Sequence, residues 1–265
     1  MIDPATTNPP HDNLDPAEVE QFNRQATLWW DATGPFRLLH RIGPIRLDYI
    51  RNAATTHFKL PPDASKPFDG LDCLDVGCGG GLISEPLARL GGQTTGIDPA
   101  PKNIGTAKAH ALQSGVKVNY RSIQAEELST EGATFDMVVC LEVIEHVPDP
   151  AAFLKTLGSL VRPGGLLVLS TLNRTAKSFA LAIVGAEYIL RWLPTGTHDW
   201  NRFITPDELG QHTTRAGLEG FSAKGIAYNP ISDIWHLADD LSVNYLAHAA
   251  KPTLTNTNAS PVDAS

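Results

Sequence analysis

Short apolar runs alternate with helical segments through most of the chain, and this alternation restricts the possible folds more than any other feature. The runs predicted to be strands are 71–77, 94–98, 118–123, 135–141 and 166–172. Helical segments are predicted at about 83–90 and at about 150–161. A third follows the strand at 94–98 and runs to about residue 113. Strands that are apolar throughout and separated by helices are typical of a parallel sheet covered on both faces. With two further strand-like stretches, 219–228 and 241–246, we expect a mostly parallel, seven-stranded α/β fold.

The predicted α/β domain occupies residues 67–250 and carries additions at both ends. Residues 1–15 and 251–265 are polar and rich in proline, threonine and asparagine, so we predict disordered tails. Residues 16–66 are predicted to be an N-terminal helical segment followed by a linker. Residues 173–215 interrupt the alternation of strands and helices. We therefore expect this last segment to be an insertion in the domain.

The composition excludes several classes of protein. The 21 basic and 29 acidic residues give a net charge of −8, which argues against nucleic acid as the main partner. No apolar run is long enough to span a bilayer, and the polar N-terminus lacks the apolar segment of a secretory signal. The three cysteines lie in or beside apolar runs without metal-finger spacing, as expected for reduced thiols. We expect a cytoplasmic protein, either free or on the membrane surface.

A glycine-rich turn follows the first predicted strand and opens a helix. Asp75 precedes it, and Gly77, Gly79 and Gly81 occupy alternate positions. Glycines allow a tight turn and let a ligand approach the backbone closely. The last glycine of the dinucleotide fingerprint G-x-G-x-x-G is replaced by Leu82, which disfavours NAD and its pyrophosphate. The turn therefore predicts a nucleoside cofactor that has no pyrophosphate.

Two acids at the ends of the next strands are candidate contacts for this cofactor. Asp98 ends the second strand, where acids accept hydrogen bonds from ribose hydroxyls. Its alternative role is a helix cap, because Pro99 follows it. Glu126 follows the third strand and is a candidate adenine contact, or else a solvated acid. Together, turn and acids favour a Rossmann-like class I fold that binds S-adenosylmethionine, with helices on both faces of the sheet.

Glu142, Glu145 and His146 follow the fourth strand, at the sheet edge where open α/β folds bind ligands. In a helical turn these three side chains would share one face. Two carboxylates and an imidazole could hold a divalent ion such as Mg²⁺ or Mn²⁺. Alternatively, His146 is a general base oriented by a carboxylate such as Glu142. A third possibility is a polar turn that faces solvent.

Several motifs resemble the ubiquinone-biosynthesis O-methyltransferases. The resemblance covers roughly residues 20–248 and is carried by Trp29-Trp30-Asp31, 40–46, 74–81, 141–150, 162–165, 170–174, 184–190, 196–200 and 244–248. The tryptophan pair, STLNR at 170–174 and VGAEYIL at 184–190 are more specific than the methyltransferase core. The resemblance implies S-adenosylmethionine-dependent methylation of ring hydroxyls on polyprenylated catechols, namely 3-demethylubiquinol and 2-polyprenyl-6-hydroxyphenol.

The resemblance also implies roles for individual residues. Cofactor-binding positions of the family fall on Arg46, Gly77 and Asp98, and a fourth, usually methionine, is Leu141 here. In some members a divalent metal is attributed to the positions of Glu142, Glu145 and His146. The same resemblance implies peripheral attachment to the inner face of the cytoplasmic membrane and contact with other ubiquinone-biosynthesis enzymes. Since a catechol chelates metals through two oxygens, we favour Mg²⁺ over the base alternative.

The insertion contains an amphipathic run, 178–193, followed by a polar loop. The run is too short and too charged to span a bilayer, and it suits either an interfacial helix or a lid. His198, Asp199 and Trp200 in the loop are candidates to cover the substrate. Two other functions are compatible with the motifs: an NAD-dependent oxidoreductase, and a non-catalytic membrane-docking module that binds S-adenosylmethionine.

Overall fold

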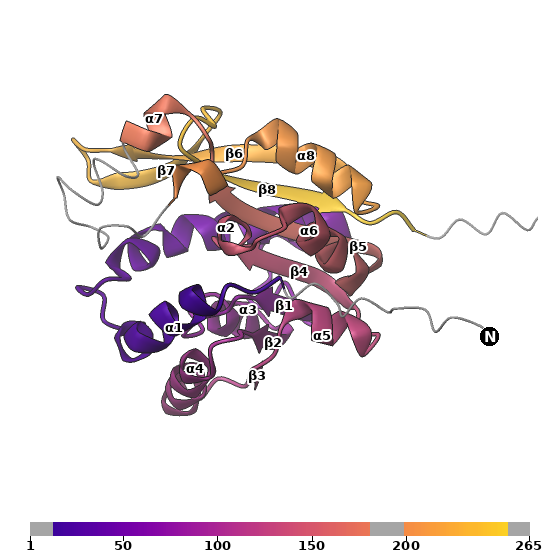
Figure 1. The fold of residues 1–265 in the computed structure, drawn as a ribbon. Helices are drawn as coiled ribbons and strands as arrows, with labels where there is room; N and C mark the ends of the chain where they lie inside the picture. The colour runs from indigo at the N-terminus through magenta and orange to yellow at the C-terminus, as the bar shows by residue number, and fades with distance from the viewer. Residues whose placement is uncertain (1–12, 181–198, 254–265) are drawn as a thin grey trace, which may run out of the picture.

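An eight-stranded mixed sheet forms the centre of the protein, with helices on both faces (Figure 1). The computed structural model describes residues 13–180 and 199–253. The strands are β1 (Asp72–Val76), β2 (Gln93–Ile97), β3 (Asn119–Arg121), β4 (Phe135–Leu141), β5 (Val161–Leu172), β6 (Glu219–Asn229), β7 (Ile234–Ala238) and β8 (Asn244–Ala250). The helices are α1 (Pro16–Gln25), α2 (Arg37–Phe58), α3 (Ser84–Arg89), α4 (Pro101–Ser114), α5 (Ala125–Thr130), α6 (Pro150–Leu160), α7 (Ala176–Ser178) and α8 (Pro206–Arg215).

The sheet order is β3-β2-β1-β4-β5-β8-β6-β7. The first five strands of this order run parallel, and β8, β6 and β7 pair antiparallel. The α/β prediction is confirmed, but the expected number of strands was wrong by one. The additional strand, β7, is only five residues long, is interrupted by the polar His236, and forms a hairpin with β6 at the sheet edge.

Each face of the sheet packs against its own helices. On one face, inward residues of β1, β4 and β5 pack against α5, α6 and α8 in one apolar cluster. On the other face, the alternate residues of the same strands pack against α2 and α3. Helix α4 covers the β2–β3 end beside the glycine turn. Because the parallel strands are buried on both sides, their sequences are apolar throughout, and this is why they could be recognised.

Parts of both predicted tails are packed against the domain. The side chain of Asn13 donates to the carbonyl of Asp149 at 2.9 Å and accepts from its amide at 2.7 Å. The next acid, Asp15, accepts from the amide of Ala17 and caps α1. At the other end, the Lys251 ammonium donates to two backbone carbonyls, with distances of 2.9 and 2.8 Å. The boundaries predicted for disorder therefore include ordered residues.

The described residues include part of the predicted insertion. Its described parts contain α7, a 3-10 turn at Trp200–Arg202, and α8. Most of the amphipathic run 178–193 and all of His198 lie outside the described residues. None of the helices in the described part of the chain combines the length and the apolar character needed to cross a bilayer.

Candidate active site

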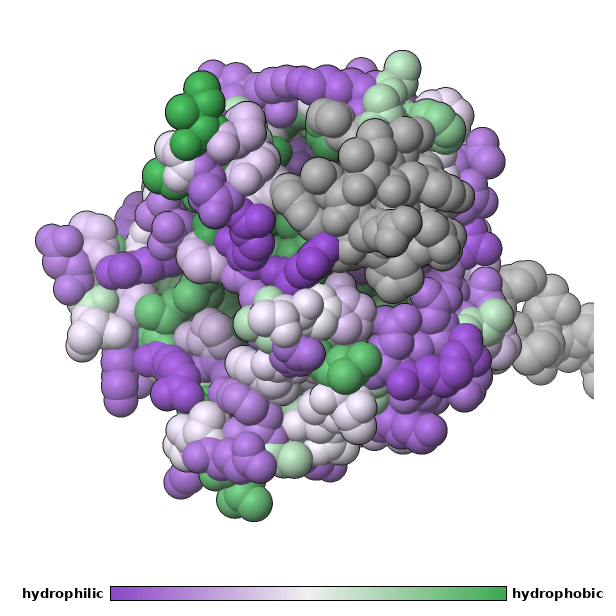
Figure 2. Space-filling view, turned by 90° about the vertical axis from the view of Figure 1, so that its left-hand side faces the viewer, coloured by the Kyte–Doolittle hydropathy of each residue, from purple (hydrophilic) through white to green (hydrophobic). Residues whose placement is uncertain are grey.

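A large cavity lies at the carboxyl ends of β1, β2 and β4, where open α/β sheets bind ligands. Its volume is about 1320 Å³, which exceeds the roughly 300–1,000 Å³ of a typical site for one small molecule. The parallel strands point toward the face shown in Figure 2, where apolar side chains are visible in hollows between hydrophilic rims. The glycine turn and the segment after β4 both line this cavity, so it has room for a cofactor and a second ligand.

The glycine turn has the left-handed backbone that only glycine adopts without strain. Gly77, Gly79 and Gly81 have φ angles of 70°, 53° and 94°. A Cβ at Gly77 would lie 2.4 Å from Val143 Cγ2, and one at Gly79 would lie 2.4 Å from the Trp29 indole. The missing side chains thus make room for the protein's own residues, a role that the ligand-based interpretation of this turn did not anticipate.

Asp98 connects the glycine turn to the end of β2. Its carboxylate accepts from the Gly79 amide at 3.0 Å, from the Ala100 amide at 2.8 Å and from the Asn103 side chain at 3.2 Å. Burial raises the pKa of Asp98 to about 6. Asp98 lines the cavity. The N-cap residue of α4 is Ala100, so Asp98 holds the turn rather than acting as a simple helix cap.

Asp75 also lines the cavity, but it faces a different partner. Its carboxylate accepts from the Ser84 hydroxyl at 2.5 Å, and burial raises its pKa to about 7. The predicted adenine contact, Glu126, lies in the first turn of α5 and is not among the residues that line the cavity. Leu141 does line it, as a buried apolar side chain at the end of β4. Asp75 and Leu141 are therefore placed at the cavity, and Glu126 is not.

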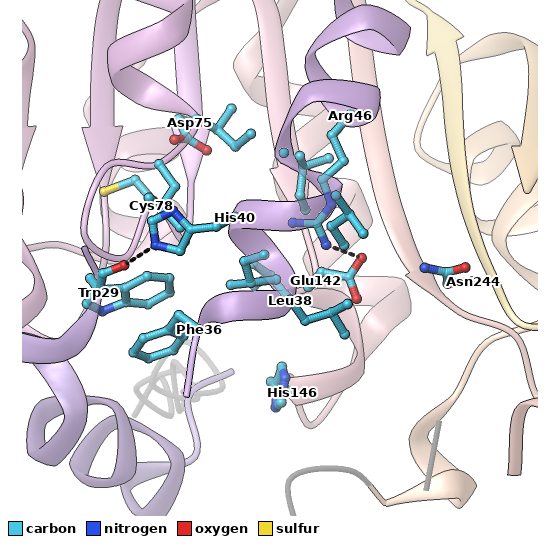
Figure 3. A pocket seen from close by; sticks show the side chains of 18 of the residues that line it. Trp29, Phe36, Leu38, His40, Arg46, Asp75, Cys78, Glu142, His146 and Asn244 are labelled. Atoms are coloured by element: carbon cyan, nitrogen blue, oxygen red, sulfur yellow. Dashed lines mark hydrogen bonds and ion pairs between the residues drawn. The ribbon is translucent and has the colours of Figure 1, made fainter. Parts of the chain in front are cut away.

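Arg46 reaches the cavity from α2. Its guanidinium is buried and lies 2.9 Å from the Glu142 carboxylate, and the Ser170 hydroxyl donates to the same oxygen at 2.7 Å (Figure 3). The Nε of Arg46 is buried and has no hydrogen-bond partner. Leaving a buried donor unpaired costs roughly 1–3 kcal/mol, and more for a charged group. Arg46 is consequently suited to bind an anionic group of a ligand.

The predicted helical turn at 142–146 does not form. Glu142 has a φ of 54°, which is rare for a residue with a side chain and costs of order 1–3 kcal/mol. Only a short 3-10 turn, Ile144–His146, follows it. The expectation that Glu142, Glu145 and His146 share one helical face was therefore wrong. The left-handed residue turns the chain before a helix can start, and the three side chains have separate partners.

Glu145 and His146 are held in different ways. One Glu145 oxygen accepts from the Thr171 hydroxyl at 2.9 Å, and the other is buried without a hydrogen-bond partner. Burial raises the pKa of Glu145 to about 7, and the nearby negative charge of Glu142 contributes to this increase. His146 Nδ1 lies 3.3 Å from the carboxylate of Glu18 on α1. Burial lowers the pKa of His146, but the hydrogen bond to Glu18 and the surrounding carboxylates outweigh it, so its pKa is raised.

The three-ligand metal site expected from the sequence is not assembled. Within the described ranges, no group of three or more histidine, cysteine, aspartate or glutamate side chains is arranged to hold a metal. Two carboxylates still fit an ion: Glu142 lines the cavity, and one oxygen of Glu145 is unpartnered. Mg²⁺ commonly binds one or two carboxylates together with water and substrate oxygens. The donor set thus suits a two-carboxylate Mg²⁺ site without His146.

Sequence reasoning missed Glu18, and two of its candidates for covering the substrate have partners of their own in the structure. No local pattern in the sequence indicates the pairing of Glu18 with His146. Asp199 caps the 3-10 turn that follows it, and the Trp200 indole donates to the Thr175 carbonyl at 3.0 Å. Neither Asp199 nor Trp200 lines the cavity. The candidate role of His198 is not addressed by the described residues.

Comparisons with known proteins agree on the class of protein. A family model described as a methyltransferase domain matches residues 46–223. The chain is 52% identical over 240 residues to a ubiquinone biosynthesis O-methyltransferase of Cereibacter sphaeroides, covering 90% of this chain and 97% of that protein. A protein of the same name from Methylobacterium nodulans is 49% identical, covering 93% of this chain and 98% of that protein.

A solved structure supports the fold. Magnesium protoporphyrin IX methyltransferase from Synechocystis, with bound S-adenosylhomocysteine, superposes with a TM-score of 0.60 at 20% identity. The match covers 88% of this chain and 94% of the other. At this low identity the likeness concerns the fold alone. The sequence relatives, however, overturn both the oxidoreductase alternative and the non-catalytic one.

Proposed function

The chain belongs to the ubiquinone biosynthesis O-methyltransferases, and from this we propose that it methylates ring hydroxyls of 3-demethylubiquinol and 2-polyprenyl-6-hydroxyphenol. It is an S-adenosylmethionine-dependent O-methyltransferase. The observation that carries the substrate proposal is the cavity of about 1320 Å³, which is lined by the glycine turn and, after β4, by Glu142 and His146. A cofactor and an aromatic acceptor can therefore lie next to each other in one cavity.

The cofactor part of the proposal assigns one chemical group to each residue. The carboxylate of Asp98 accepts hydrogen bonds from the ribose hydroxyls, and Leu141 packs on the adenine. The unpaired Nε of Arg46 donates to the carboxylate of the methionine part. Gly77 allows the backbone to approach the cofactor. These contacts hold the sulfonium so that its methyl group faces the acceptor oxygen, as an in-line displacement requires.

The acceptor must lose a proton, and His146 is the proposed base. A free phenol has a pKa near 10, so only about one molecule in a thousand is ionised at pH 7. His146 lines the cavity, and the Glu18 carboxylate holds its Nδ1. In this proposal the imidazole of His146 takes the proton from the phenol, and Glu18 stabilises the imidazolium that results. The orienting carboxylate thus belongs to α1 and not to the segment after β4.

We also propose a Mg²⁺ ion held by the carboxylates of Glu142 and Glu145. Bound near the catechol, such an ion would favour ionisation of the ring hydroxyl by its charge. The unpartnered oxygen of Glu145 and its adjacency to Glu142 support this site. The Glu145→Gln variant should lose Mg²⁺ stimulation and keep its affinity for S-adenosylhomocysteine. Full activity in excess chelator would leave His146 as the sole means of deprotonation.

The membrane surface is the proposed source of the polyprenylated substrate. Besides the amphipathic run 178–193, the hairpin of β6 and β7 has an apolar tip, where Ile231 is 96% and Ile234 is 57% exposed. Tyr228 and Trp235 of the same hairpin line the cavity. An apolar tip next to the cavity can enter the headgroup region while the cavity opens toward the lipid.

Liposome sedimentation tests this membrane proposal. Deleting 178–193 should abolish binding, and the paired Ile231→Ser and Ile234→Ser change should weaken it. The Leu112→Ser variant is the control, because Leu112 is 84% exposed on α4 and lies outside the cavity. All variants should retain their affinity for the cofactor. Unchanged sedimentation of both test variants would contradict the proposal.

The substrate proposal is tested with short-tailed acceptors. Labelled S-adenosylmethionine is incubated with a demethylubiquinol and with the corresponding ring that lacks the adjacent hydroxyl, each with Mg²⁺ or with chelator. We expect rapid labelling of the catechol with Mg²⁺, loss of activity on chelation, and recovery when Mg²⁺ is returned. Equal labelling of both rings would show that the enzyme does not require a catechol.

A further inference from the structure

Trp29 lies directly on the glycine turn, although it belongs to the segment between α1 and α2. Its side chain is only 7% exposed. A Cβ at Gly79 would meet the six-membered ring of the indole at 2.4 Å, and a Cβ at Gly80 would meet Trp29 Cβ at the same distance. The two glycines therefore form a platform for this indole. Figure 3 shows it beside Phe36 and Cys78, at the edge of the cavity.

A buried chain of hydrogen bonds leads from Trp29 to the ribose-binding carboxylate. The indole Nε1 donates to Asn103 Oδ1 at 2.8 Å, and Asn103 Nδ2 donates to Asp98 Oδ1 at 3.2 Å. An indole N–H can only donate, so it determines which end of the Asn103 amide faces Trp29. The NH₂ group of Asn103 must then face Asp98. One of the three hydrogen bonds that hold the carboxylate thus depends on a donor from outside the methyltransferase core.

Trp29 is itself held firmly from the side of α2. The indole stacks on Phe36 with ring centroids 3.9 Å apart and planes 5° apart. The His40 ring nitrogen lies 2.8 Å from the Trp29 carbonyl, as the dashed line in Figure 3 marks. Stacking and a backbone contact leave the indole little freedom to turn. The N–H group is consequently aimed at Asn103 before any ligand binds.

We propose that Trp29 is a positioning residue for the cofactor, acting through Asn103 to orient Asp98 toward the ribose hydroxyls. This inference rests on the proposed ribose contact of Asp98. Trp29 need not touch the cofactor for this role. Its effect must therefore depend on the ribose hydroxyls, whereas a residue that only anchors the N-terminal segment would affect all ligands of the pocket alike.

The test compares two ligands and two tryptophans. Affinities for S-adenosylhomocysteine and for an analogue without both ribose hydroxyls are measured by calorimetry. The Trp29→Phe variant keeps an aromatic ring for stacking and loses the N–H. We expect it to bind S-adenosylhomocysteine about three- to tenfold more weakly, as for one buried hydrogen bond, and to bind the analogue less than twofold more weakly. The Trp30→Phe variant is the control, because the Trp30 indole donates to the Gly80 carbonyl and not toward Asp98.

A second variant breaks the same chain without changing the indole. Asn103→Leu should show the same selective loss, and adding Trp29→Phe to it should cause no further selective loss. This variant decides the outcome if Trp29→Phe does not fold. Equal losses for both ligands in Trp29→Phe and Asn103→Leu would overturn the inference and leave Trp29 as an anchor. If the wild-type protein binds both ligands equally well, the ribose contact of Asp98 is wrong, and the inference falls with it.

Discussion

Replacing Gly77 by alanine tests whether the glycine turn serves the fold as well as the cofactor. An alanine with a φ of 70° costs about 1–2 kcal/mol. Its Cβ would lie 2.4 Å from Val143 Cγ2, and overpacking of this kind costs typically 1–3 kcal/mol. The Gly77→Ala protein should therefore unfold with a free energy about 2–5 kcal/mol lower than the wild type, without any cofactor present.

The assay is urea denaturation of the cofactor-free protein, combined with the Val143→Ala change. Removing the valine methyls relieves the close contact but not the backbone strain. We expect the double variant to be about 1–3 kcal/mol more stable than the sum of the single changes predicts. Additivity within about 0.5 kcal/mol would refute the packing argument. So would an unchanged stability of Gly77→Ala combined with a lost affinity for the cofactor, because the glycine would then serve the ligand alone.

Two other substitutions probe the site from α1 and α2. Glu18→Gln removes the hydrogen bond and the charge that raise the pKa of His146, so that pKa falls. Because the base must be neutral, the acid limb of the rate–pH profile should move to lower pH, and the plateau rate should fall because the base is weaker. Glu20→Gln on the exposed side of α1 is the control. An unmoved acid limb in Glu18→Gln would exclude the pairing of Glu18 with His146. Arg46→Met should raise the KM for S-adenosylmethionine about 10- to 100-fold by removing a charged donor, as measured by initial rates. Arg51→Met on the same helix should leave this KM unchanged, since Arg51 does not line the cavity, and a normal KM in Arg46→Met would contradict its assigned role.

Features encoded within short segments could be predicted from the sequence. The parallel strands were recognised because burial on both faces makes them apolar throughout. Asp98 was found because a strand end places it next to the glycine turn, at a separation typical of doubly wound sheets. The structure confirms that Asp98 and the turn are in contact, with 3.0 Å between Gly79 N and the carboxylate.

Features that depend on distant segments could not be predicted. The helical face expected after β4 failed because Glu142 is left-handed, and the buried guanidinium of Arg46 lies beside its carboxylate. The partner of His146 comes from α1, and no local pattern marks Glu18 for this role. Strand β7 was missed because it is only five residues long and the polar His236 interrupts its apolar run. The pairings of Glu142 with Arg46 and of His146 with Glu18 join segments whose spacing in the sequence carries no information.

The central claim is that one cavity brings S-adenosylmethionine and a catechol hydroxyl together for methyl transfer. The most direct measurement uses the purified chain, labelled S-adenosylmethionine and a short-tailed demethylubiquinol, with the product identified by mass spectrometry. The account predicts one labelled methyl ether on the ring for each S-adenosylhomocysteine formed. Tight binding of the cofactor without transfer, or a label on ring carbon instead of oxygen, would contradict it.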